Sequence, residues 1–151
     1  MHPVIHLNFG FCAANTYAGF MEGFPNTVKQ ALLKAGFDYV TGESPAVNLG
    51  NAIEWFFAKG TPCVILIDEY DDPVAKALAA PEEADLVRSE LAKVYGQFKD
   101  RTTMIRFLMI TGVSKFTKMS VFSALSNLTD ISPFPATSFM AHGRRRGVRQ
   151  C

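Results

Sequence analysis

Residues Cys63–Val74 read CVILIDEYDDPV, and this stretch carries the clearest structural signal of the chain. Four consecutive apolar residues, VILI, are followed directly by Asp68 and Glu69. A short continuous apolar run that ends in turn residues is typical of a strand buried on both faces, as in a parallel sheet. Acids that follow such a strand lie at the carboxyl edge of the sheet, where open α/β proteins bind their ligands. The stretch therefore predicts an α/β fold with a candidate site at Asp68 and Glu69.

Two other segments predict strands that accompany Cys63–Asp68. Pro3–Phe9 alternates apolar and polar residues, and Met104–Ile110 is apolar except for Arg106, which is awkward in a buried strand. Helices are expected between and after the strands, from about Pro25 to Gly36, from Asn48 as a cap to Gly60, from Glu82 to Lys99 and over Met119–Leu128. Residues 10–23 are expected to be mainly loop. Helices that alternate with strands predict a parallel sheet of about three strands, with Cys63–Asp68 in the middle and flanking helices in a three-layer arrangement.

The composition restricts the class of protein. With 151 residues, 48% of them hydrophobic and 19% charged, the chain has the size and composition of one folded domain. No apolar run approaches the roughly 20 residues of a membrane-spanning helix, and the first residues do not resemble a secretion signal. The three cysteines are widely spaced and match no metal-binding pattern. We therefore expect a cytoplasmic protein with reduced thiols and no membrane partner.

The basic residues are unevenly distributed. Residues 142–151, HGRRRGVRQC, contain four of the 15 Lys and Arg residues and no acid. The rest of the chain has 11 basic and 14 acidic residues, a formal charge of −3. The arginine cluster is compatible with a contact to nucleic acid, but the mildly acidic body gives no support for one.

The residues that follow the strands suggest several kinds of site. In P-loop nucleotide hydrolases an Asp after a hydrophobic strand holds Mg²⁺, and the next acid polarises the attacking water. Thr111 follows the neighbouring strand and would lie at the same edge, although by itself it is better explained as a turn residue. The cluster Asp68–Asp72 could alternatively form a two-metal hydrolase site. His6 is not expected to be a metal ligand.

The segments LIDEYDDP, from Leu66, and LMITGVSKFTKMSVFSALSNLTDIS, from Leu108, resemble the AAA-ATPase-like family of predicted ATPases. The resemblance covers roughly Pro3 to Ser132. It implies a P-loop NTPase-like fold and a role in Mg²⁺-dependent ATP binding and hydrolysis. In the matching positions, Asp68 would hold the metal and Glu69 would act on the catalytic water. Thr111 and Ser114 would contact the nucleotide, with Lys115 able to assist.

The chain departs from this family in two respects. It contains no GxxxxGK[ST] phosphate-binding loop, which family members carry upstream of the strand corresponding to Pro3–Phe9. Residues 1–132 are therefore expected to form a partial ATPase-like domain that retains the Walker B and sensor regions and is inactive alone. Residues 133–151 do not match the family and are expected to be a disordered basic tail. The alternatives are a non-catalytic interaction domain derived from an ATPase and a metal-dependent phosphodiesterase that uses Asp68–Asp72.

These interpretations predict a specific geometry. The carboxylate of Asp68 and the hydroxyl of Thr111 should face the same crevice, with Glu69 directed toward it and with Asp71 and Asp72 more exposed. In related ATPases the strand of the phosphate loop pairs beside the segment Met104–Ile110. We therefore expect this segment to be an exposed sheet edge through which the chain could associate with itself.

Overall fold

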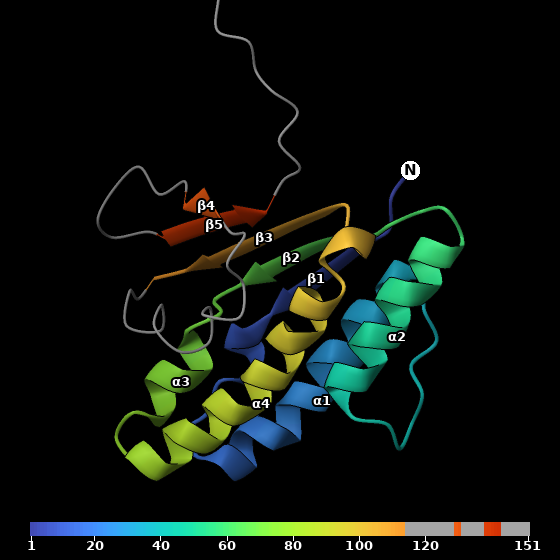
Figure 1. The fold of residues 1–151 in the computed structure, drawn as a ribbon. Helices are drawn as coiled ribbons and strands as arrows, with labels where there is room; N and C mark the ends of the chain where they lie inside the picture. Colours follow the sequence, from blue (N-terminus) through green and yellow to red (C-terminus); the bar gives the residue numbers. More distant parts are fainter. Residues whose placement is uncertain (114–128, 131–137, 143–151) are drawn as a thin grey trace, which may run out of the picture.

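The computed structural model describes residues 1–113, 129–130 and 138–142, and these form a sheet with helices packed against it (Figure 1). The parallel strands are β1 (Val4–Asn8), β2 (Val64–Asp68) and β3 (Phe107–Gly112), with β2 between the other two. The strand β5 (Ser138–His142) pairs antiparallel with β3, and β4 (Thr129–Asp130) pairs antiparallel with β5. The predicted α/β fold and its three parallel strands are thus confirmed.

The helices of the described residues all lie on one face of the sheet (Figure 1). They are α1 (Tyr17–Ala35), α2 (Pro45–Ala58), α3 (Asp72–Ala77) and α4 (Pro81–Asp100), with short 3₁₀ helices η1 (Phe9–Cys12) and η2 (Thr102–Met104). This part of the chain therefore has two layers rather than the expected three. The helix predicted over Met119–Leu128 lies outside the described residues. None of the described helices is both long enough and apolar enough to cross a membrane.

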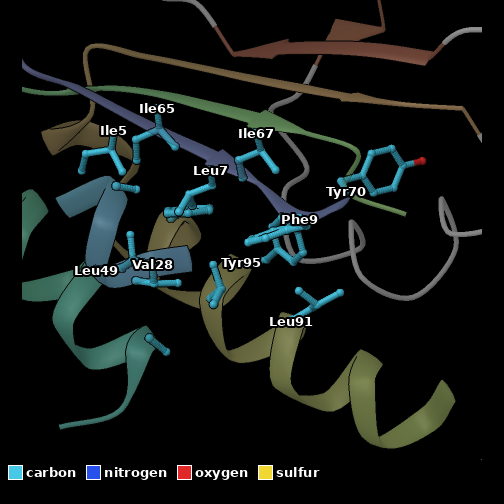
Figure 2. Packing of buried hydrophobic residues seen from close by; sticks show 14 of the residues in the cluster. Ile5, Leu7, Phe9, Val28, Leu49, Ile65, Ile67, Tyr70, Leu91 and Tyr95 are labelled. Atoms are coloured by element: carbon cyan, nitrogen blue, oxygen red, sulfur yellow. The ribbon is translucent and has the colours of Figure 1, made fainter. Parts of the chain in front are cut away.

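The hydrophobic core lies between the sheet and these helices (Figure 2). Because successive side chains of a strand point to opposite faces, each parallel strand contributes alternate residues to this core. The contributing strand residues are all at most 3% exposed, namely Ile5, Leu7, Ile65, Ile67, Leu108 and Ile110. The intervening residues of β2, including Leu66, are only half-buried. The expectation that β2 is buried on both faces is therefore wrong for the described part of the molecule.

Two helices begin earlier than the sequence predicts. Helix α1 begins at Tyr17, where the side chain of Thr16 accepts a hydrogen bond from the Gly19 N–H at 3.1 Å. Pro25 lies inside this helix, and burial of Phe20 and Phe24 extends it through the glycine-rich segment predicted to be loop. The tertiary contacts of these aromatic residues outweigh the weak local helix propensity.

Helix α2 is capped by Ser44, whose side chain accepts a hydrogen bond from the Val47 N–H at 3.2 Å. Asn48 is therefore not the cap. Its fully buried side chain accepts a hydrogen bond from the Val40 N–H at 2.8 Å and donates to the carbonyl of Val40 at 3.1 Å. Asn48 thus fixes the loop that precedes the helix, because a buried amide must find such partners.

The third strand begins later than predicted, and its outer edge is covered. Arg106 lies before β3 and is exposed, so its charged side chain does not have to be buried in the strand. Its backbone N–H donates to the carbonyl of Cys63 at 2.8 Å. The outer edge of β3 pairs with β5, so the expectation of an exposed edge there is wrong. Since β5 lies within residues 133–151, five of the residues expected to be disordered form a strand.

Candidate functional site

Asp68 is the last residue of β2 and lies on the sheet face opposite the core, at the carboxyl end of the parallel strands. Its two carboxylate oxygens have different partners. The Thr111 hydroxyl donates to Oδ1 at 2.6 Å, and His6 Nε2 lies 2.7 Å from Oδ2. Because an ionised carboxylate only accepts hydrogen bonds, the imidazole nitrogen is the donor in this pair. One carboxylate is thus held by side chains from both neighbouring strands, β1 and β3.

These contacts favour the charged form of Asp68. The hydrogen bond from Thr111 lowers the pKa of this carboxyl the most, the hydrogen bond from His6 lowers it further, and partial burial opposes the shift. The Asp68 side chain remains 42% exposed. Asp68 is therefore an anion at neutral pH that solvent can reach.

Asp68 and Thr111 lie side by side, as the sequence predicts. Their chemistry can be compared with that of a Mg²⁺-nucleotide site. Each carboxylate oxygen has a second lone pair besides the one occupied by Thr111 or His6. Mg²⁺ commonly uses one or two carboxylates and takes its remaining ligands from water and phosphate oxygens. An exposed, ionised carboxylate beside a hydroxyl therefore fits this chemistry.

The loop after β2 is attached to the end of β3. The Tyr70 N–H donates to the carbonyl of Thr111 at 3.1 Å, and the Val113 N–H donates to Asp71 Oδ1 at 3.3 Å. Gly112 makes this contact possible, because a Cβ atom on it would collide with the Tyr70 ring and with Asp71 Oδ1. These contacts hold the loop after β2 against the end of β3, next to Asp68 and Thr111. The sequence alone does not predict this role of Gly112.

The acids that follow Glu69 do not gather around Asp68. Asp71 is only 4% exposed and faces the end of β3, so the expectation that it is exposed is wrong. Asp72 is half-buried in the first turn of α3 and lies 3.7 Å from the Lys76 ammonium. Within the part of the chain that the structure describes, no group of three or more His, Cys, Asp and Glu side chains could hold a metal ion. The geometry thus gives no support to a two-metal site built from Asp68–Asp72.

Glu69 lies at the same edge of the sheet, on the side of β1. Its backbone φ of 52° is in the left-handed region, which is unusual for a residue with a side chain. The exposed side chain packs over Gly10, where a Cβ atom would collide with Glu69 Oε2. Thr111 thus contacts Asp68 from the β3 side, and the Glu69 side chain lies over the start of η1, directly after β1. The catalytic role of Glu69 stays a prediction.

Two further sequence predictions have different outcomes in the structure. Ser114 and Lys115 lie outside the described residues, so their placement beside the site stays a prediction. His6, which is not expected to be a metal ligand, holds one oxygen of Asp68 through a hydrogen bond. The parallel register pairs Asn8 with Asp68, and His6 precedes Asn8 by two residues on the same face. Because this register joins strands that are far apart in the sequence, no local sequence pattern identifies His6.

The two described cysteines play no part in this site. Cys12 and Cys63 are free and buried, and burial raises the pKa of each thiol to about 11. Both are therefore protonated at neutral pH, which makes them poor nucleophiles and poor metal ligands.

Comparison with known proteins gives a family. A family model described as "Predicted AAA-ATPase" matches residues 1–122. The chain is also similar to a protein of Azotobacter chroococcum mcd 1 named "Uncharacterized protein in vnfD 5'region", with 38% identity over 135 residues that cover 87% of this chain. The chain spans about a quarter of that relative, 25% of its length. No solved structure matches. The chain belongs to the predicted AAA-ATPase family.

Proposed function

We propose that this chain supplies the metal-binding half of a Mg²⁺-dependent ATP-hydrolysing site. The observation that supports this most is the carboxylate of Asp68, which is held as an accessible anion by donors from the strands on both sides. It stands at the carboxyl end of the central parallel strand, where α/β proteins bind ligands. The family match agrees with this reading.

Each side chain has a distinct role in the proposal. Asp68 holds the metal through a lone pair that Thr111 and His6 leave open. Thr111 would turn its single hydroxyl hydrogen from Asp68 to the γ-phosphate when the nucleotide binds. Glu69 orients the attacking water and accepts its proton, the part that an acid after the metal-binding Asp plays in such sites. Ser114 would add a hydroxyl to the nucleotide. When bound, Mg²⁺ neutralises charge on the phosphate oxygens.

The chain by itself is expected to bind nucleotide weakly. Its sequence has no GxxxxGK[ST] loop, the segment whose backbone N–H groups and Lys neutralise the triphosphate charge. Calorimetry with Mg-ATP should therefore show a Kd weaker than about 100 µM, which corresponds to roughly −5.5 kcal/mol. Tighter binding by the chain alone would reveal a second phosphate site and would contradict the proposal that this half is incomplete.

The proposal is tested by joining the chain to the phosphate-loop segment of a family member. The joined protein should bind Mg-ATP and hydrolyse it, and Asp68→Asn should remove the metal-dependent part of binding. Glu69→Gln should lower hydrolysis by about 10²–10⁴-fold while binding is kept. Glu82→Gln, at an exposed acid in the first turn of α4, is the matched control and should leave both unchanged.

Two outcomes would overturn parts of the proposal. Undiminished hydrolysis with Gln at position 69 would show that Glu69 is not catalytic. A folded joined protein that fails to bind Mg-ATP would remove the nucleotide site altogether and would favour the alternative of a non-catalytic interaction domain.

A further inference from the structure

The strand β1 has an unpaired outer edge among the described residues. It pairs with β2 on one side, where the Val64 N–H donates to the carbonyl of Pro3 at 2.8 Å. In a parallel ladder with this register, Ile5 bonds to β2 and its neighbours Val4 and His6 direct their N–H and C=O groups outward. No backbone partner for these outward groups is found within the described ranges. Such a row of donors and acceptors is a template for another strand.

A groove of about 460 Å³ runs along this edge, between β1 and α1. Val4 and His6 line it from the strand. From the helix it is lined by Asn26, Gln30 and Lys34, which are spaced four residues apart and therefore lie on one helix face. A groove between an open strand edge and a helix has the shape that an extended peptide fills when it adds to a sheet.

The lining of the groove also specifies the chemistry of its occupant. It contains the ammonium of Lys34, and none of the lining residues has a carboxylate. The imidazole of His6 already donates to Asp68 and does not count as a partner for the occupant. Phe11, which is 84% exposed, lines the groove as well and offers an apolar contact. This combination favours a peptide with acidic side chains and at least one apolar side chain.

We propose that this groove binds an extended acidic peptide segment, which adds to β1 as a new strand. Backbone hydrogen bonds to Val4 and His6 supply the strand pairing. Alternate side chains of the peptide face the helix and the open sheet face, so the set of acidic residues that faces the helix can reach Lys34. This interaction is independent of ATP hydrolysis and goes beyond the proposed function.

A second copy of this chain fits the edge less well. Symmetric antiparallel pairing of two β1 strands around their middle residue would place His6 opposite His6 of the other copy. The strand sequence VIHLN also offers no carboxylate to Lys34. The acidic peptide is therefore the better match, and self-association becomes one outcome of the test.

The test uses the complete chain and three blocked heptapeptides. The first alternates glutamate and valine, the second has lysine in place of glutamate, and the third is the first with two consecutive central N-methyl groups. Calorimetry should show binding of the first peptide, about tenfold weaker binding of the second, and loss of binding for the third, which cannot pair with a strand. Amide NMR signals of Val4 and His6 should shift on binding.

Matched variants locate the interaction. Lys34→Glu should weaken binding of the glutamate peptide by about tenfold. Lys29→Glu changes the net charge equally, at an exposed position of the same helix that does not line the groove, and should have little effect. Val4→Pro removes an outward N–H group without removing a bond to β2 and should also weaken binding.

Several results would overturn the proposal. These are no binding at about 1 mM of the glutamate peptide, equal affinity for the lysine peptide, or an equal loss of affinity in Lys29→Glu. NMR shifts confined to residues away from β1 and α1 would also overturn it. A dimer of the chain alone that Val4→Pro dissociates would assign the edge to a second copy instead.

Discussion

The two faces of the parallel sheet have different contents. The face toward the helices carries only apolar side chains from β1, β2 and β3, and all of them are almost completely buried. The opposite face carries the polar trio His6, Asp68 and Thr111 near its carboxyl end, with half-buried apolar residues such as Leu66 beside it. The comparison shows that one face holds the fold together while the other presents the candidate chemistry.

The first prediction concerns the stabilities of the two faces. Ile67→Ala removes a 1% exposed side chain from the core and should lower the free energy of unfolding by about 2–5 kcal/mol. Leu66→Ala, its neighbour on the other face, should cost about 1 kcal/mol because only part of its side chain is removed from water. Urea unfolding of both variants measures the difference. Equal losses would show that both faces are buried to the same extent.

A second, smaller effect tests how the site is attached to the fold. In Gly112→Ala the new Cβ would collide with Tyr70 and Asp71, so unfolding should become easier by about 1–3 kcal/mol. Gly96→Ala is the control, because a Cβ there meets nothing within 4 Å and the residue lies inside α4. This control should raise stability by roughly 0.5–1 kcal/mol. If Gly112→Ala behaves like Gly96→Ala, the loop after β2 is not packed against β3 as described.

The contrast between the faces also explains what the sequence could predict. The apolar runs and the polar residues that end them identified the three parallel strands and brought Asp68 and Thr111 to one edge. The run VILI is apolar at every position, so it could not reveal that only alternate residues enter the core. His6 was missed because its contact with Asp68 depends on the register between strands that are distant in sequence. The start of α1 was missed because Phe20 and Phe24 stabilise it through tertiary contacts.

A third prediction concerns the two donors on the open face. The hydrogen bond from Thr111 is the largest single effect that lowers the Asp68 pKa, and the hydrogen bond from His6 lowers it further, so Thr111→Val and His6→Ala should each raise this pKa. Carbon NMR of the Asp68 carboxyl as a function of pH measures both. An unchanged Asp68 pKa in Thr111→Val would contradict the assigned hydrogen bond.

The smallest expected effect is a pH dependence of stability. The folded-state pKa of Asp68 lies below the ordinary value of 3.8, so its stabilising contribution is present above that value and is lost as the pH falls through the lowered pKa. The difference in unfolding free energy between the wild type and Asp68→Asn should therefore shrink as the pH falls below 3.8. A difference that grows on acidification would contradict the direction of the shift.

The central claim is that the open face, through Asp68, holds the metal of a bound nucleotide. The most direct measurement replaces Mg²⁺ by paramagnetic Mn²⁺ with ATP in the protein joined to a phosphate-loop segment. The amide signals of Asp68 and Thr111 should broaden first, and Asp68→Asn should abolish the broadening. Strong broadening that persists in Asp68→Asn, or that centres on residues away from the carboxyl ends of β2 and β3, would contradict the account.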